Sequence, residues 1–254
     1  MSAMLQRASS GLRRQFRSLL GERNSGALDF YLGRLDKNPW GGPFNGQDGR
    51  RKIFNAIAQL QKPALIAETG TYRGTTTEAL AEIGAPVISI EGQRRNYGFA
   101  RARLRNRSNV RVRCGDSREQ LRALFRELDE GRTRGTLFAY LDAHWYADLP
   151  LRGELDIVFK WDPDAIVMID DFRVPDDAGY GYDNYGPGAV LDAEYIAPTL
   201  HVHGLISLYP SLPSDQETGA RRGCVVITSN RWKSDLLSTG LLREIQSHDL
   251  PNSR

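Results

Sequence analysis

Three aspartates follow two short apolar segments, at positions where they could share a metal ion. Asp142 comes directly after residues 136–141, and Asp170 and Asp171 come after residues 165–169. If these segments are neighbouring strands, the three carboxylates meet at one edge of a sheet and repel each other unless a cation lies between them. No lysine or arginine in either motif is placed to neutralise them. All-oxygen ligands favour Mg²⁺, Mn²⁺ or Ca²⁺, so the sequence predicts a divalent metal site. The simpler interpretation is that these aspartates only begin loops.

His144 lies two residues after Asp142 and is the nearest candidate for a general base. Histidine titrates near neutral pH and can take a proton from a hydroxyl group. An alternative of equal weight is that His144 supports the metal site or contacts a bound nucleoside. Asp142 and His144 are therefore the catalytic candidates.

A glycine-rich turn at residues 68–74, with the sequence ETGTYRG, follows another apolar segment. Glycines at a strand-to-helix turn let the backbone approach a ligand closely. The spacing G-x-x-x-G differs from the dinucleotide fingerprint. Glu68, directly before the first glycine, would repel a pyrophosphate but attract a sulfonium. The turn favours S-adenosylmethionine over NAD, although an ordinary turn would explain the same residues.

Two further polar positions suit a nucleoside. Glu91 lies 23 residues after Glu68 and could accept hydrogen bonds from both ribose hydroxyls. Asp116 and Ser117 could contact an adenine edge. All three also have a structural explanation, because acids are favourable at helix N-termini and both Asp and Ser cap helices.

A regular alternation of strands and helices must position these residues. Periodicity predicts strands at 64–67, 86–90, 109–114, 136–141 and 165–169, and helices at 74–83, 94–104, 117–128 and 149–159. This alternation indicates an α/β fold with a doubly wound, mostly parallel, Rossmann-like sheet that binds ligands at the carboxyl ends of its strands. After a loop, the pattern continues with a helix at 189–195 and a C-terminal antiparallel hairpin of strands at 203–209 and 222–228.

The N-terminal region is predicted to be a separate unit. Residues 1–47 are expected to form a helical arm followed by a loop rich in glycine and proline, and residues 48–254 the Rossmann-like domain. The arm lacks the apolar core of a secretory signal, and it would pass for a mitochondrial transit peptide only in a eukaryote. We expect it to pack on the body or on a second copy of the chain. Trp40 and Phe44 could complete a lid or anchor the arm.

Composition excludes several classes of protein. The 254 residues carry a formal net charge of +3, of which residues 1–23 contribute +4, so the body has no basic excess to attract nucleic acid. The arginines of residues 94–113 are interpreted as a solvated face, because no aromatic residues alternate with them. No apolar run approaches the roughly 18–20 residues of a membrane helix. Two cysteines, Cys114 and Cys224, form no disulfide framework, which favours a reducing, cytoplasmic location.

The ordered motifs resemble class I S-adenosylmethionine-dependent O-methyltransferases, most closely the metal-dependent catechol and macrocin O-methyltransferase group. The motifs are ETGTYRG at 68–74, ISIE at 88–91, GDS at 115–117, LDAHW at 141–145 and IDDF at 169–172. They cover about half of the chain. Relatives of this group have also been labelled cephalosporin hydroxylases, so the fold alone does not decide the reaction.

The resemblance assigns roles to individual residues. In that group, the methionine part of the cofactor would be lined by Glu68, Gly70, Tyr72 and Gly74. Glu91 would hold the ribose, and Asp116 and Ser117 would contact the adenine side. A divalent ion such as Mg²⁺ would be bound by Asp142, Asp170 and Asp171. The catechol enzymes carry a lysine base shortly after the first metal aspartate. This chain has Trp145 three residues after Asp142 and no lysine between Lys62 and Lys160, which leaves the base open.

The predicted function is therefore a divalent-metal-dependent O-methyltransferase that acts on a small hydroxylated acceptor, such as a sugar, a natural product or a catechol-like compound. The metal would bind the acceptor hydroxyl and lower its pKa. The loop at 179–188 carries three tyrosines suited to a flat acceptor. The alternatives are an NAD-dependent oxidoreductase or a non-catalytic S-adenosylmethionine-binding module, while the neutral body disfavours an RNA methyltransferase.

Overall fold

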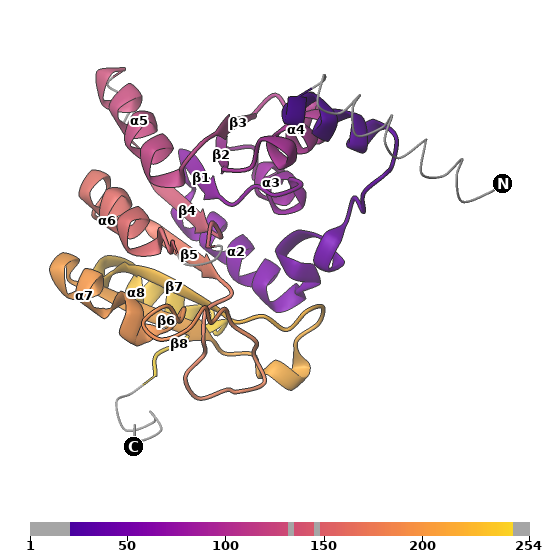
Figure 1. Ribbon diagram of the computed structural model, residues 1–254. Coiled ribbons are helices and arrows are strands. Elements are labelled where there is room, and N and C mark those ends of the chain that lie inside the picture. The colour runs from indigo at the N-terminus through magenta and orange to yellow at the C-terminus, as the bar shows by residue number, and fades with distance from the viewer. Residues whose placement is uncertain (1–20, 132–134, 145–147, 246–254) are drawn as a thin grey trace.

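The computed structural model of the chain describes residues 21–131, 135–144 and 148–245. Within these residues, eight strands form one mixed sheet with helices on both faces (Figure 1). The strands are β1 Leu65–Thr69, β2 Val87–Glu91, β3 Val110–Cys114, β4 Leu137–Leu141, β5 Ile166–Asp170, β6 Leu205–Pro210, β7 Cys224–Ser229 and β8 Leu242–Arg243. Their order across the sheet is β3-β2-β1-β4-β5-β7-β6-β8. Strands β1 to β5 are parallel to one another. Strand β7 is antiparallel to both β5 and β6, so β6 runs in the same direction as the first five strands.

Two separate apolar layers bury the faces of the sheet. The helices are α2 Asp48–Gln61, α3 Thr75–Leu80, α4 Arg94–Arg103, α5 Ser117–Glu130, α6 Leu151–Trp161, α7 Ala193–His203 and α8 Lys233–Ser238. Residues of α5, α6 and α7 form one layer, and residues of α2, α3 and α8 form the other. In β4, Ala139 and Leu141 belong to the first layer, and Phe138 and Tyr140 to the second. Successive side chains of a strand face opposite ways, so an apolar strand without alternation is buried on both faces.

The strand order reverses beside β1, because the chain proceeds to β2 and β3 on one side and returns to β4 on the other. Ligands of open α/β sheets bind at such a point, outside the carboxyl ends of the strands. The backbone amide of Asp142 donates a 3.0 Å hydrogen bond to the carbonyl oxygen of Thr69, which ties the ends of β4 and β1 together. Residues that follow these strands therefore share one crevice.

The predicted fold class is confirmed, and the first five strands lie within one or two residues of their predicted limits. The helix expected at 189–195 is wrong. Helix α7 begins only after Asp192, whose side chain accepts a hydrogen bond from the amide of Tyr195, and it continues to His203 despite containing Pro198. Val190 instead forms a β-bridge with Asn184. Helix α8 and strand β8 were not predicted.

The described part of the N-terminal arm packs on the body. Residues 21–31 are helical and cross α4 closely, since a Cβ on Gly26 would lie 1.8 Å from the carbonyl oxygen of Arg95. The Arg95 guanidinium also forms a 2.5 Å ion pair with the buried Asp29. Most of the expected arm lies in residues 1–20, outside the described residues. A domain boundary at residue 47 and a dimer formed through the arm stay predictions.

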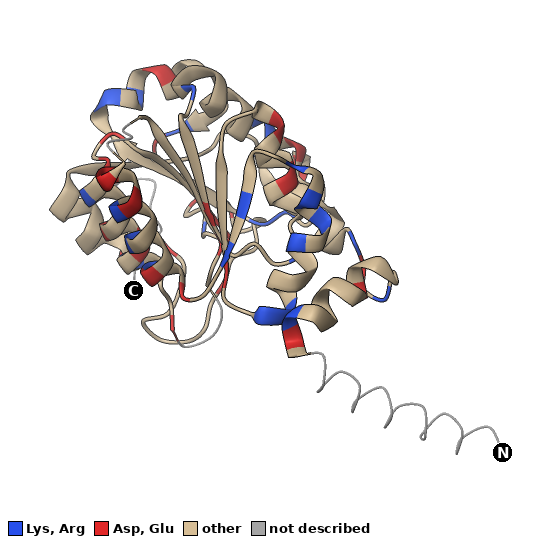
Figure 2. Ribbon diagram, turned by 90° about the horizontal axis from the view of Figure 1, so that it is seen from above, with Lys and Arg blue, Asp and Glu red and all other residues tan. Residues whose placement is uncertain are grey.

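Basic and acidic residues are interspersed over the outer helices (Figure 2). The interpretation of residues 94–113 as a solvated face is only partly right. Arg103 pairs with Glu78 at 2.9 Å, and Arg113, which is nearly buried, pairs with Glu127 at 2.5 Å. Both cysteines are free thiols. Among the described helices, none has the length and apolar character needed to cross a membrane.

Candidate functional site

A cavity of about 550 Å³ opens at the carboxyl ends of β1, β2 and β3. Five of the seven residues predicted to bind the cofactor line it: Gly70, Tyr72, Glu91, Asp116 and Ser117. They come from three different strand ends, so the sheet brings them together from separate parts of the sequence. We refer to this space as the cofactor cavity.

The turn after β1 forms one wall of the cofactor cavity. Gly70 has a φ of 82°, and a Cβ at this position would lie 2.1 Å from the carbonyl oxygen of Asp142. Tyr72 also has a left-handed backbone, with a φ of 48°. Its amide donates a 2.6 Å hydrogen bond to Oε2 of Glu91. Only glycine fits the close approach at position 70.

Glu91 ends β2 with its carboxylate partly held by backbone amides. Besides Tyr72, the amide of Gln93 donates to it at 2.8 Å. Burial raises the pKa of Glu91 to about 7, and the two amide hydrogen bonds offset only part of that effect. A carboxylate in this position can still accept hydrogen bonds from a ligand that lies in the cavity.

Asp116 and Ser117 occupy the start of α5 as well as the cavity wall. Asp116 is the N-cap, and its side chain accepts hydrogen bonds from the amides of Arg118 at 2.9 Å and Glu119 at 3.2 Å. The side-chain hydrogen bond from Arg118 lowers the pKa of Asp116. The sequence analysis offered capping and contact with a ligand as alternatives for these residues. Their positions are compatible with both.

Glu68 and Gly74 are not among the residues that line this cavity in the described part of the chain. Glu68 is buried, and the hydroxyls of Thr77 and Ser89 each donate to its Oε2 at 2.5 Å. Burial raises the pKa of Glu68 to about 7. Gly74, with a φ of 77°, is the N-cap residue directly before α3. These two residues therefore support the turn after β1 without lining the cavity.

A second cavity, also of about 550 Å³, adjoins the first. Its lining residues are Trp40, Asn45, Gly70, Tyr72, Asp142, His144, Asp171, Asp183, Tyr185, Ala220 and Arg222. Gly70 and Tyr72 belong to both cavities, so the turn after β1 is their common wall. We call this second space the acceptor cavity.

Two loops were expected to surround the site, one with Trp40 and Phe44 and one at 179–188, and only some of their aromatic side chains line the acceptor cavity. Trp40 lines it and is 66% exposed, whereas Phe44 is buried in the core, so Phe44 is the anchor of this loop. In the loop at 179–188, Tyr185 lines the cavity, while Tyr180 belongs to the core. The Tyr185 hydroxyl donates to the carbonyl oxygen of His144 at 2.6 Å, which joins this loop to the end of β4.

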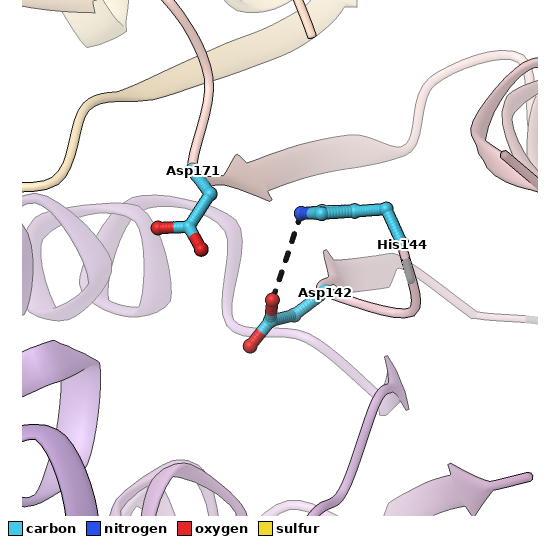
Figure 3. A group of neighbouring side chains, drawn as sticks. All are labelled: Asp142, His144 and Asp171. Carbon is cyan, nitrogen blue, oxygen red and sulfur yellow. Dashed lines mark ion pairs between the residues drawn. The ribbon is translucent and has the colours of Figure 1, made fainter. Parts of the chain in front are cut away.

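Asp142, His144 and Asp171 form a cluster at one end of the acceptor cavity (Figure 3). One potential metal-binding atom of each residue lies within 4.8 Å of the others. His144 Nε2 is 3.6 Å from Oδ1 of Asp142. His144 is 2% exposed, and neither ring nitrogen makes a hydrogen bond to the described residues, although the backbone of Asp170 is nearby. Burial lowers the pKa of His144 to about 4, so the ring is neutral at physiological pH.

Asp170 is not part of this cluster. Its Oδ1 forms an ion pair with Arg50, and its Oδ2 accepts hydrogen bonds from the Tyr140 hydroxyl at 2.7 Å and the Asn45 amide at 3.3 Å. Both Asp170 and Arg50 are almost fully buried. Burial is the main influence on the pKa of Asp170 and raises it, and Arg50 acts in the opposite direction.

Arginines from outside both aspartate motifs neutralise part of the negative charge. Arg222 Nε donates to Asp171 Oδ1 at 2.8 Å, and its guanidinium also pairs with Asp183. The sequence analysis assumed that only a bound cation could neutralise these aspartates. That assumption is wrong for Asp170, which pairs with Arg50, and only partly right for Asp171, which pairs with Arg222. Burial, followed by the neighbouring carboxylates of Asp170 and Asp171, raises the pKa of Asp142 well above its usual range.

Sequence reasoning missed Arg50 and Arg222. Arg222 was expected only as the first residue of the strand at 222–228, and nothing in that pattern marked it as a partner of the aspartates; in the structure it forms a β-bridge with Gly181. Arg50 had a detectable signal, because it shares the apolar face of α2 with Ile53, Phe54 and Ile57 at helical spacing. A charged residue on such a face is rarely buried without a partner, which would have suggested an acid opposite it.

Comparison with known proteins addresses the fold. No protein-family model and no curated protein matches the sequence. A Staphylococcus aureus protein provisionally assigned as a caffeoyl-CoA O-methyltransferase aligns with a TM-score of 0.50 and 14% identity, over 71% of this chain and 83% of its own. A protein that converts a disulfide bond into a thioacetal group during echinomycin biosynthesis aligns with a TM-score of 0.50 and 14% identity, over 80% of this chain and 90% of its own.

This chain has the class I methyltransferase fold. A weaker similarity, with a TM-score of 0.44 and 17% identity over 71% of this chain and 80% of the other, is to the O-methyltransferase TomG from Streptomyces achromogenes, solved with S-adenosylmethionine. The cofactor cavity is lined by five of the seven residues that the sequence resemblance assigns to S-adenosylmethionine.

Proposed function

We propose that the protein transfers a methyl group from S-adenosylmethionine to a hydroxyl of a small acceptor, with the help of a divalent cation. The observation that carries this proposal is the common wall of the two cavities at Gly70 and Tyr72. With a nucleoside in the first cavity and a hydroxylated compound in the second, acidic one, the methyl donor and the acceptor would lie within reach of each other.

The reaction would be an in-line displacement. The acceptor oxygen attacks the methyl carbon, the carbon–sulfur bond breaks, and the electron pair stays on sulfur to give S-adenosylhomocysteine. Positioning dominates such a step, because the oxygen must come to about 3 Å from the carbon. Glu91 would hold the ribose and Asp116 and Ser117 the adenine side, leaving the methyl group directed across the shared wall.

The charge of the acceptor cavity supports a cation there. Three carboxyl groups, those of Asp142, Asp171 and Asp183, line the cavity with one guanidinium, that of Arg222, and His144 is neutral. When the carboxylates are ionised, a divalent ion would balance the remaining charge. The buried and unpaired ring nitrogens of His144 also suit a ligand that binds neutral imidazole. A bound ion would lower the pKa of the acceptor hydroxyl and hold the oxygen in place.

The lining of the acceptor cavity suggests the class of acceptor. Trp40, Tyr72 and Tyr185 offer flat surfaces, and Asn45 offers an amide. Vicinal hydroxyls on a ring, as in a sugar or a catechol, could both pack on such surfaces and chelate an ion. We therefore propose a sugar, natural-product or catechol-like acceptor in a reducing, cytoplasmic setting.

The proton of the acceptor hydroxyl has two routes out of the site. His144 is the base predicted from the sequence, and it is neutral, but its pKa of about 4 makes it a weak proton acceptor. Alternatively, the cation lowers the pKa of the hydroxyl enough for the proton to pass to water. The first route needs an imidazole nitrogen of His144 that is not bound to the ion, and the second does not.

Calorimetry with S-adenosylmethionine, S-adenosylhomocysteine and NAD tests the proposed function most directly. We expect the two sulfur nucleosides to bind and NAD not to bind. Incubation with S-adenosylmethionine and a panel of catechols and sugars should then give products heavier by one methylene group. Binding of NAD without binding of S-adenosylhomocysteine would favour the oxidoreductase instead.

A further inference from the structure

The carboxylate of Asp170 is engaged inside the protein, although the sequence resemblance assigns it to the metal. Its oxygens are taken by Arg50, Tyr140 and Asn45, and its side chain is 2% exposed. If an ion recruited Asp170, Arg50 would be left buried without its counter-charge, which is strongly unfavourable. The metal site therefore needs another ligand.

We propose that Asp142, His144 and Asp171 hold the ion, with His144 in the place of Asp170, and that the ion is an imidazole-binding transition metal such as Fe²⁺, Co²⁺ or Zn²⁺. This inference rests on the proposed function, because it concerns the cation of the same site. It changes both the ligand set and the class of metal. Carboxylate-only sites suit Mg²⁺, whereas imidazole suits Fe²⁺ and Zn²⁺.

The placement of His144 carries the inference furthest. The ring is buried, lines the acceptor cavity, and has no hydrogen-bond partner for either nitrogen among the described residues. Figure 3 shows a ring nitrogen directed at the carboxylate of Asp142, and the 3.6 Å between Nε2 and Oδ1 is too long for a hydrogen bond. Two ligands that are each about 2.1 Å from a tetrahedral ion lie about 3.4 Å apart, so the 3.6 Å between these two atoms is compatible with a shared ion.

The backbone at Asp171 explains how the third ligand reaches the cluster. Adjacent residues of an extended strand point to opposite faces, so Asp170 and Asp171 would normally diverge. Asp171 instead has a φ of 53°, a left-handed conformation that is uncommon for a residue other than glycine. This turn sends Asp170 to Arg50 in the interior and Asp171 into the acceptor cavity. Strained residues of this kind concentrate at functional sites.

Arg222 can remain in place when the ion binds. It pairs with Asp183 as well as with Asp171, and its Nε contacts only one of the two Asp171 oxygens. The other oxygen stays available to an ion. Metal ligation would also take the base role from His144, because a nitrogen bound to an ion has no lone pair for a proton. The acceptor hydroxyl, with its pKa lowered by the ion, would then lose its proton to water.

Cobalt provides the test, because its visible absorption reports nitrogen and oxygen ligands directly. Full-length protein, stripped with a chelator, is titrated with Co²⁺ alone, without nucleoside or acceptor. We expect saturable absorption bands that Zn²⁺ abolishes and millimolar Mg²⁺ does not. His144→Gln should weaken Co²⁺ binding at least about 10–100-fold, the loss typical even of groups that only support a metal ligand. His201→Gln, at an exposed histidine of α7, should bind Co²⁺ like the wild type.

Other outcomes would overturn the inference. If His144→Gln binds Co²⁺ normally while Asp170→Asn does not, the carboxylate triad of the resemblance is right. If Mg²⁺ competes at concentrations similar to those of Zn²⁺, the ion is not an imidazole-selecting one. Failure of Co²⁺ to bind to wild type also contradicts the inference. Thermal unfolding of each variant shows whether it is folded, and S-adenosylhomocysteine binding by the wild type, measured on the same preparation, tests the methyltransferase proposal separately.

Discussion

The amide of Tyr72 donates a 2.6 Å hydrogen bond to the carboxylate of Glu91, and this bond joins the turn after β1 to the end of β2. Two elements that are each predicted to contact the cofactor are thereby linked directly. Glu91 supports the cavity wall with one oxygen, and that wall is shared with the acceptor cavity.

Replacing Glu91 should weaken cofactor binding. Glu91→Ala removes the acceptor for the ribose hydroxyls and for the Tyr72 amide, and we expect S-adenosylhomocysteine to bind less tightly by about 1–3 kcal/mol. Isothermal calorimetry measures the loss, with Glu82→Ala, at an exposed position, as the control. Unchanged affinity in Glu91→Ala would show that Glu91 does not contact the nucleoside.

Removal of the divalent ion should separate catalysis from cofactor binding. The acidic cluster lies in the acceptor cavity and the nucleoside residues in the cofactor cavity. A chelator should therefore abolish methyl transfer while S-adenosylhomocysteine still binds, and added metal should restore turnover. Methyl transfer that persists after exhaustive chelation would exclude a metal-dependent reaction.

Breaking the ion pair between Arg50 and Asp170 should destabilise the fold strongly. In Arg50→Met the carboxylate stays buried without its counter-charge, and we expect a loss of about 3–5 kcal/mol in the free energy of unfolding. Arg51→Met, at the exposed neighbouring position, should change little. Urea unfolding measures both variants. The double variant Arg50→Met with Asp170→Leu should recover much of the loss, and a double variant as unstable as Arg50→Met would contradict this explanation.

Stability should fall as pH rises through the titration of Glu154. Burial raises the pKa of this carboxyl to about 7, and the nearby hydroxyls of Ser117 and Thr69 offset only part of the shift. The folded state then keeps a proton that the unfolded state loses from about pH 4.5 upward, so folding is weakened between roughly pH 4.5 and 7 by up to about 3 kcal/mol. Glu154→Gln cannot titrate, and its stability relative to wild type should be greater at pH 8 than at pH 5. An equal difference at both pH values would contradict the shifted pKa.

The sequence predicted the parts of this molecule that depend on local pattern. Apolar runs such as residues 136–141 and 165–169 are strands whose alternate side chains pack into the two apolar layers, as expected for central strands of a parallel sheet. The polar residues that follow them, including Asp142 and Asp171, face the crevice because parallel strands end at one edge of the sheet. The start of α7 could not be predicted, since it depends on the cap at Asp192 and tolerates Pro198 within the helix.

The charge balance of the site could not be predicted in the same way. Asp170 and Asp171 are adjacent in the sequence, yet one faces the interior and the other the cavity, because of a single left-handed residue. Their partners, Arg50 and Arg222, are distant in the sequence and carry no motif. Long-range pairing of this kind depends on the completed fold.

Arg50 bonds to Asp170, 120 positions away, and to the carbonyl oxygen of Arg222, 172 positions away. These three segments can meet only after the chain has closed very long loops, and such contacts are among the slowest to form. We therefore expect the geometry around the acidic cluster to form late in folding. Metal binding at this cluster would report that the last long-range contacts have formed, and it could serve as a probe of when folding is complete.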